Sequence, residues 1–154
     1  MEKAFNTIKK AFSTKPILAF PDFTSGKPFI FDSDWCKEGM AQGISQEQEG
    51  PDGIRERVIA YGGRKCTEAE KNYSSNKGET ASFNDGLHRF EHILRFAPFK
   101  ARVDNRCLNY IRNLKKPTGI WNRWLEFIDS FQFEIQHRAG KKHGNVVALS
   151  RATH

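Results

Sequence analysis

The sequence predicts an α/β protein in which helices pack on a mixed β-sheet. Three strand-like runs come first, at residues 28–34, 39–46 and 57–61. Helical and strand-like segments then alternate, which gives the order β-β-β-α-β-α-α-β-α. The composition is that of an ordinary globular chain of 154 residues, with 38% hydrophobic and 28% charged residues. No apolar stretch approaches the roughly 20 residues that a membrane helix needs.

Residues 1–26 are expected to form a leader ahead of a domain that spans residues 27–154. Apolar residues from Ala4 to Phe12 have the spacing of an amphipathic helix, and Pro16 ends it. The leader either docks on the domain or links it to something upstream. It lacks the apolar core and small-residue cleavage site that a secretory signal carries.

The first three strands predict an antiparallel meander. Residues 28–34 form an apolar run that ends in two acids, Asp32 and Asp34, and such a run is typical of a strand buried on both faces. Residues 39–46 form a weaker strand, and a Pro-Asp-Gly turn at residues 51–53 separates it from the third.

The longest helical signal runs from Thr67 to about Phe96. Thr67 to Glu70 is typical of a helix start, residues 72–76 interrupt the pattern, and a helix over about 76–95 follows. Its buried face is an apolar stripe of Phe83, Leu87, Phe90 and Leu94. We expect four poor helix formers to weaken this helix, each by up to about 1 kcal/mol relative to Ala. They are Gly78, Asn84, Asp85 and Gly86.

Two further strands are expected in the second half of the chain. Residues 99–103 alternate like a half-buried strand that ends at Asp104, and residues 131–137 have the same period and end at His137. Helices are expected at residues 107–114, 120–131 and 146–152.

The charge balance favours a polyanionic partner. The net charge is +7 and the isoelectric point is about 9.5. Residues 105–125 and 136–154 contain Lys and Arg but no Asp or Glu, so the basicity is concentrated in the C-terminal half. A solvated basic face that binds nothing would give the same composition.

The cysteines argue against a structural zinc site. Cys36, Cys66 and Cys107 are far apart, and no C-x-x-C pair exists. An odd, sparse set of plain thiols suits a reducing compartment.

Three acids are candidates for chemistry. Asp34 and Asp104 each end a strand, and Glu79 lies early in the long helix. A single acid at a strand end is usually a turn or cap residue. Three converging carboxylates would instead repel one another unless cations neutralised them, and oxygen ligands of this kind suit Mg²⁺ or Mn²⁺. Their spacing alone leaves both interpretations open.

An ordered series of short motifs covers essentially the whole chain. The motifs are Ala4-Phe5 through Pro21-Asp22-Phe23, Lys27-Pro28-Phe29 to Asp34, Ser45-Gln46, Ile59-Ala60-Tyr61-x-x-Arg64-Lys65, Asn72-Tyr73-Ser74, Tyr110-Ile111-x-x-Leu114, Arg123-Trp124-Leu125, Phe133-Glu134-Ile135-x-His137-Arg138, Lys141-Lys142-His143-Gly144-Asn145 and Ala148-Leu149-Ser150-Arg151. No single motif is specific, but the series resembles the ribonuclease H domain of gypsy-type LTR retrotransposon polyproteins.

The resemblance implies an RNase H-like fold, with a five-stranded mixed sheet of three antiparallel strands followed by parallel strands, flanked by helices. It also implies a metal-dependent endonuclease that cuts the RNA strand of RNA–DNA hybrids with two magnesium ions, for which manganese can substitute. Asp34, Glu79 and Asp104 fall at three of the family's four acidic metal ligands. His137 falls at its loop histidine, with a role in proton transfer or product release, although a lone histidine at a strand end is more often structural.

The place of the fourth acid is occupied by Val147, which has no ligand atom. This departure leaves two hypotheses: an endonuclease with impaired metal binding, or a non-catalytic module that binds hybrid or duplex nucleic acid or braces a reverse transcriptase. Trp35-Cys36 also replaces a pair of small residues, and the weakened helix agrees with relaxed constraint. Asp32, on the same strand face as Asp34, is a conceivable substitute ligand.

The resemblance implies four nucleic-acid-binding residues: Asn76, Arg138, Lys141 and Lys142. A helix cap is the equally weighted alternative for Asn76, and Trp121 and Trp124 are expected in the core rather than under bases. The expected partners are an RNA–DNA hybrid and a reverse transcriptase domain upstream in a polyprotein, without a membrane. The expected location is the cytoplasm, in a virus-like particle, or the nucleus, and not the secretory route.

Overall fold

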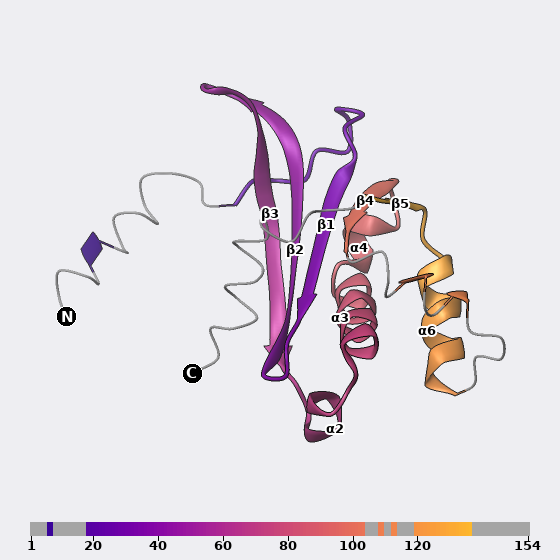
Figure 1. Ribbon diagram of the computed structural model, residues 1–154. Helices are drawn as coiled ribbons and strands as arrows, with labels where there is room; N and C mark the ends of the chain where they lie inside the picture. The colour runs from indigo at the N-terminus through magenta and orange to yellow at the C-terminus, as the bar shows by residue number, and fades with distance from the viewer. Residues whose placement is uncertain (1–5, 8–17, 104–107, 110–111, 114–118, 137–154) are drawn as a thin grey trace.

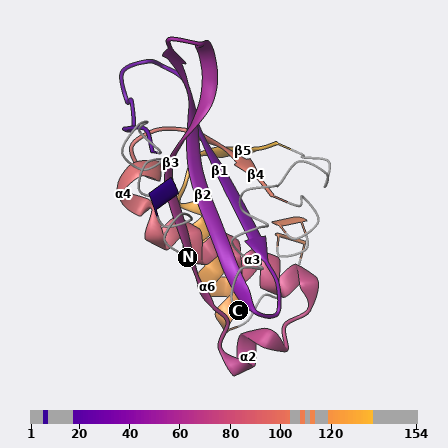
Figure 2. The same ribbon diagram turned by 90° about the vertical axis from the view of Figure 1, so that its left-hand side faces the viewer.

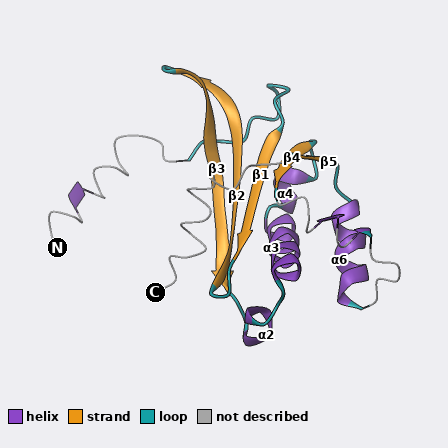
Figure 3. Cartoon of the chain, viewed as in Figure 1, coloured by secondary structure: helices purple, strands orange, loops and turns teal. Residues whose placement is uncertain are grey.

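The computed structural model describes residues 6–7, 18–103, 108–109, 112–113 and 119–136. These residues form a five-stranded mixed sheet with α3, α4 and α6 on one side (Figures 1 and 3). The elements are β1 (Phe29–Trp35), β2 (Gly39–Gly50), β3 (Gly53–Lys65), α2 (Glu68–Lys71), α3 (Ser75–Arg89), α4 (Glu91–Leu94), β4 (Phe99–Arg102), α6 (Ile120–Asp129) and β5 (Phe133–Ile135).

The strand order is β3-β2-β1-β4-β5. The first three strands pair in antiparallel fashion, and β1–β4 and β4–β5 pair in parallel. The predicted meander and the predicted mixed sheet are therefore confirmed. The strand that contains Asp34 and the strand that precedes Asp104 are neighbours, and their ladder extends as far as Asp32 opposite Arg102.

The β2–β3 hairpin is longer than predicted. β2 continues to Gly50 and β3 begins at Gly53, whose φ of +88° allows a tight turn between them. Because β1 pairs only with Met40 to Gln46, the tip of the hairpin projects beyond β1 (Figure 2). Both strands of the tip are mostly polar and exposed, so no apolar alternation marks them in the sequence.

The predicted helix start and interruption are both present. Thr67 caps α2 with a reciprocal capping box to Glu70, and α3 begins after Ser74. The single helix expected over 76–95 is divided at Phe90, whose φ of −107° and ψ of 17° are not helical, so α3 and α4 are separate.

The glycines of α3 allow close helix-to-sheet packing, so our expectation that they merely weaken the helix is incomplete. A Cβ at Gly78 would overlap the indole ring of Trp35. A Cβ at Gly86 would lie 2.5 Å from Phe31 Cζ and 2.7 Å from Gln42 Cγ. The bulk of Trp35 is therefore accommodated by the absence of a side chain on the helix that covers it.

The core lies between the sheet and these helices. It is rich in phenylalanine, and its fully buried members include Phe29, Phe31, Phe83, Leu87, Leu94, Phe99 and Ile128. Trp124 is half-buried against this core, as predicted, and the Trp121 ring packs edge-on against the Trp124 ring. The helices expected at 4–12, 107–114 and 146–152 lie wholly or partly outside the described residues. No helix within the described ranges is long and apolar enough to cross a membrane.

Candidate functional site

Asp34 lies at the C-terminal end of β1, opposite Ala41 of β2, and is half-buried. It is two residues past Asp32, the last β1 residue that pairs with β4. Beyond that point the Asp34 main chain gains a hydrogen bond from another element, because Ser82 Oγ of α3 donates to the Asp34 carbonyl oxygen at 2.7 Å.

Glu79 lies on the turn of α3 that packs against this strand end. It is half-buried and sits three residues before Ser82, a spacing at which Cβ atoms of a helix are about 5–6 Å apart. Its neighbour Gly78 contacts Trp35, the residue after Asp34. The two contacts hold the helix turn of Glu79 beside the end of β1 that carries Asp34.

The other predicted site residues lie outside the described part of the chain. They are Asp104, His137, Arg138, Lys141, Lys142 and Val147. The residue before Asp104, Val103, is described and is only 4% exposed. Within the described ranges no group of three or more His, Cys, Asp or Glu is close enough to hold a metal ion. The chemistry of the described pair, Asp34 and Glu79, fits a hard divalent cation that prefers carboxylate oxygens.

Asp32, which we considered as a substitute metal ligand, pairs instead with Arg102. Its side chain is 9% exposed, and Arg102 Nη1 lies 3.8 Å from its Oδ2. Arg102 also donates two hydrogen bonds to the Glu56 carboxylate, at 2.7 and 2.8 Å. Burial alone would lower the pKa of Arg102, but Glu56 and Asp32 outweigh it and raise that pKa. Asp32 is thus part of an ion cluster on the sheet, which disfavours a move toward a metal.

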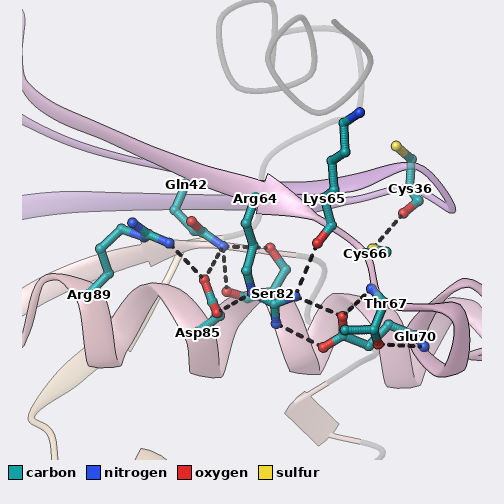
Figure 4. Close-up of polar contacts among 10 residues, drawn as sticks. All are labelled: Cys36, Gln42, Arg64, Lys65, Cys66, Thr67, Glu70, Ser82, Asp85 and Arg89. Atoms are coloured by element: carbon teal, nitrogen blue, oxygen red, sulfur yellow. Dashed lines mark hydrogen bonds and ion pairs between the residues drawn. The ribbon is translucent and has the colours of Figure 1, made fainter. Parts of the chain in front are cut away.

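A polar network connects β2, β3, α2 and α3 (Figure 4), and Ser82 joins it to the Asp34 carbonyl oxygen. We call it the Arg64 network, and its members are Arg64, Glu70, Asp85, Gln42 and Ser82. Arg64 donates to both Glu70 oxygens at 2.7 and 2.8 Å, and its Nε donates to Asp85 Oδ1 at 2.8 Å. Gln42 Nε2 reaches Asp85 Oδ2, Ser82 Oγ and the Ser82 carbonyl oxygen at 3.2–3.3 Å.

The charges of the Arg64 network are mutually stabilised. Hydrogen bonds from Arg64 and from the Thr67 main chain lower the pKa of Glu70 to about 2, against the effect of burial. The same pairing with Glu70, and a second with Asp85, raises the pKa of Arg64. The Arg64–Glu70 pair therefore stays ionised throughout the physiological pH range.

Sequence reasoning missed this network. Thr67-x-x-Glu70 was visible as a helix start, and Arg64 lies in one of the motifs, but their ion pair is not encoded by spacing. Gln42 is fully buried in β2, and a lone glutamine in a short strand carries no signal of its partners. The i, i+3 spacing of Ser82 and Asp85 on one helix face was the one local clue.

The described cysteines are free thiols. Cys66 is buried and its Sγ donates to the Cys36 carbonyl oxygen at 3.4 Å, whereas Cys36 is half-buried. Burial raises the pKa of the Cys66 thiol, so it is a poor nucleophile and packs like a small apolar residue, as predicted.

An aromatic and cationic surface lies beside the candidate site, at the starts of α3 and α6. Lys77 Nζ lies 4.0 Å from the centroid of the Tyr73 ring and 5.8 Å from that of Trp121. Asn76 is exposed in the first turn of α3, and neither helix has an acid in its first turn. The N-cap of α3 is Ser74, so the cap alternative for Asn76 is wrong.

Comparison with known proteins gives one family and several relatives. Residues 1–101 match the family described as the RNase H-like domain found in reverse transcriptase. The chain is 30% identical over 149 residues to the retrovirus-related Pol polyprotein from transposon 297 of Drosophila melanogaster, covering 97% of this chain and 13% of that protein. It is 29% identical over 153 residues to the transposon Tf2-3 polyprotein of Schizosaccharomyces pombe, covering 97% of this chain and 11% of that protein.

Solved structures agree on the fold. The foamy viral protease-reverse transcriptase dRH in complex with double-stranded DNA matches with a TM-score of 0.59 at 12% identity, covering 90% of this chain and 25% of that chain. A second foamy viral protease-reverse transcriptase complex with double-stranded DNA matches with a TM-score of 0.57 at 10% identity, covering 90% of this chain and 29% of that chain. The chain spans about an eighth of the length of the curated relatives named above.

Proposed function

The chain belongs to the RNase H-like domains found in reverse transcriptase, and from this premise we propose that it is a metal-dependent endonuclease acting on the RNA strand of RNA–DNA hybrids. The observation that carries the proposal is the contact of α3 with the end of β1, where the turn bearing Glu79 meets the strand end bearing Asp34. Two half-buried carboxylates on a rigid helix and a rigid strand are a suitable start for a metal site.

Asp34, Glu79 and Asp104 would hold two magnesium ions. Ions held there would supply positive charge to the scissile phosphate and acidify a water molecule. The chain's own residues would orient the hybrid and keep the carboxylates in place. His137 would transfer a proton or assist product release.

Binding of the hybrid would rest on charge and on contacts in its minor groove. Arg138, Lys141 and Lys142 would meet phosphates without selecting sequence. Asn76, which is exposed beside the candidate site, would reach the minor groove and its 2′-hydroxyl groups. A reverse transcriptase in the same polyprotein would supply the hybrid.

Val147 favours a second candidate, a non-catalytic module of the same fold that binds hybrid or duplex nucleic acid or braces the polymerase. A valine at the place of the fourth acid removes one carboxylate from the proposed site. Such a loss lowers affinity for one ion without removing the other three acids.

An end-labelled RNA–DNA hybrid distinguishes the two candidates. We expect RNA fragments with 3′-hydroxyl ends in Mg²⁺ or Mn²⁺, no cleavage of a DNA–DNA duplex, and no cleavage by Asp34→Asn. A folded protein that binds the hybrid but leaves it intact in both metals would support the non-catalytic module.

A further inference from the structure

Ser82 joins the candidate site to the rest of the fold through a single side chain. It is fully buried on α3, and its hydroxyl donates to the Asp34 carbonyl oxygen at 2.7 Å. The Ser82 hydroxyl oxygen in turn accepts a hydrogen bond from Gln42 Nε2 at 3.3 Å. A hydroxyl has one proton, so the bond from Gln42 leaves that proton directed at Asp34.

The rest of the Arg64 network holds Gln42 in the orientation that this requires. Gln42 Nε2 faces three oxygen acceptors: two on Ser82 and Asp85 Oδ2. Asp85 is in turn held by Arg64 Nε at 2.8 Å, and Arg64 is fixed at its other end by Glu70. A flipped amide would place the Gln42 oxygen against the Asp85 carboxylate and the Ser82 carbonyl, which is repulsive.

The β1–β4 ladder does not extend to the strand end at Asp34. The parallel ladder ends at Asp32 opposite Arg102, two residues earlier. The antiparallel ladder with β2 continues to Trp35 opposite Met40 on the other side. Ser82 therefore contributes a hydrogen bond to the Asp34 main chain at a point that the β1–β4 ladder does not reach.

We propose that Ser82 is a positioning residue that fixes the main chain of Asp34, and that Gln42, Asp85 and Arg64 set the direction of its hydroxyl proton. The inference rests on the proposed function, because Asp34 is one of the carboxylates that would hold the ions. Displacing a metal ligand by a fraction of an ångström weakens metal binding and can leave the fold intact.

The test compares two variants that each delete one buried hydroxyl from α3. Ser82→Ala removes the bond to Asp34. Thr80→Val removes a fully buried hydroxyl that donates to the Asn76 carbonyl oxygen at 2.8 Å and is not bonded to Asp34. Amide hydrogen exchange at Trp35, whose N–H shares a peptide unit with the Asp34 carbonyl, is measured without metal in both variants.

Ser82→Ala should speed exchange at Trp35 about 3- to 10-fold relative to wild type, the effect of one hydrogen bond, and Thr80→Val should not. Gln42→Met, which fills a similar volume without a donor, should act in the same direction with a smaller effect. The Mn²⁺ concentration for half-saturation, measured by titration calorimetry, should rise about 3- to 10-fold in Ser82→Ala only. Equal exchange in Ser82→Ala and Thr80→Val, or unchanged Mn²⁺ affinity in Ser82→Ala, would overturn the inference.

Failure of the nuclease activity and failure of the Ser82 positioning role give different results. Wild-type protein that leaves a hybrid intact but shows Ser82-dependent exchange and Mn²⁺ binding refutes the proposed nuclease and supports the positioning role. If the wild-type protein cleaves the hybrid but Trp35 exchanges equally fast in wild type and Ser82→Ala, only the positioning role is refuted.

Discussion

Gly78 and Trp35 fit together as a small residue and a large one. The indole of Trp35 occupies the space that a side chain at position 78 would need. This contact joins α3 to β1 one residue away from each of the two described acids, Asp34 and Glu79. A feature that lowers helix propensity in the sequence is thus required by the packing that builds the site.

Gly78→Ala should destabilise the protein by about 1–3 kcal/mol, because overpacking outweighs the roughly 1 kcal/mol that Ala gains over Gly in a helix. In a Trp35→Ala background the same substitution should be neutral or stabilising. Urea denaturation of wild type, the two single variants and the double variant gives the coupling free energy between Gly78 and Trp35. Equal effects of Gly78→Ala in both backgrounds would contradict the packing account.

Glu70→Gln should cost about 1.5–3 kcal/mol at pH 7, the range for hydrogen bonds to a charged group. The pKa of Glu70 is lowered from 4.5 to about 2, so its contribution is complete above pH 4.5 and disappears as the pH falls toward 2. The variant should therefore lose less stability than wild type between pH 4.5 and pH 2. The control is Glu68→Gln on the same helix, whose side chain is 89% exposed and pairs only with Lys71 among the contacts given by the structure. If both variants have the same pH dependence in chemical denaturation, the Arg64–Glu70 pair does not supply the effect.

Lys77→Ala should weaken hybrid binding and reduce the slope of log affinity against log salt by about 1. Lys77 stacks on Tyr73 beside the candidate site and forms no ion pair within the described ranges. The matched control is Lys27→Ala, because Lys27 lies before the start of β1 at the opposite end of that strand. Fluorescence anisotropy across a salt series measures both slopes. An equal loss of hybrid affinity in the two variants would show that the surface around Lys77 does not contact the hybrid.

Val147→Asp should raise cleavage and lower the metal concentration for half-maximal rate. Recovering the charge of one ligand corresponds to about 2–4 kcal/mol in the transition state, or roughly 30- to 1000-fold in rate. Mn²⁺ should partly rescue the wild-type chain, since it binds such ligands more tightly than Mg²⁺. Cleavage and melting temperature are measured together. A less stable variant with no gain in cleavage would mean that Val147 packs in the core and that the new carboxylate is buried without a partner.

Elements with a strong local pattern could be predicted from the sequence, and contacts between distant residues could not. The apolar run before Asp34 and the alternation from Phe99 to Val103 predicted two strands, and those strands are neighbours. The tip of the β2–β3 hairpin was missed because both of its strands are mostly exposed and polar. The division of the long helix at Phe90 was missed because an aromatic residue on an apolar stripe continues the helical pattern.

The candidate site, too, could be predicted from the sequence only in part. The resemblance supplied Asp34 and Glu79, and the described residues place the elements that carry them in contact. Ser82, Gln42 and Arg64 lie 18–40 residues apart in the sequence, so no local pattern predicts their hydrogen bonds. Gly78 was interpreted by its propensity alone, since its neighbour Trp35 is 43 residues away.

Single-turnover cleavage of the hybrid across a Mg²⁺ and Mn²⁺ titration is the most direct test of the central claim, that Asp34 and Glu79 belong to one metal-dependent nuclease site. Wild type, Asp34→Asn and Glu79→Gln are compared with Glu126→Gln, an exposed acid on α6, as control. The account predicts cleavage that saturates with metal in wild type and the control, and a loss of at least about 100-fold in each site variant. Equal cleavage by wild type and Asp34→Asn, or none by any protein in either metal, would contradict it.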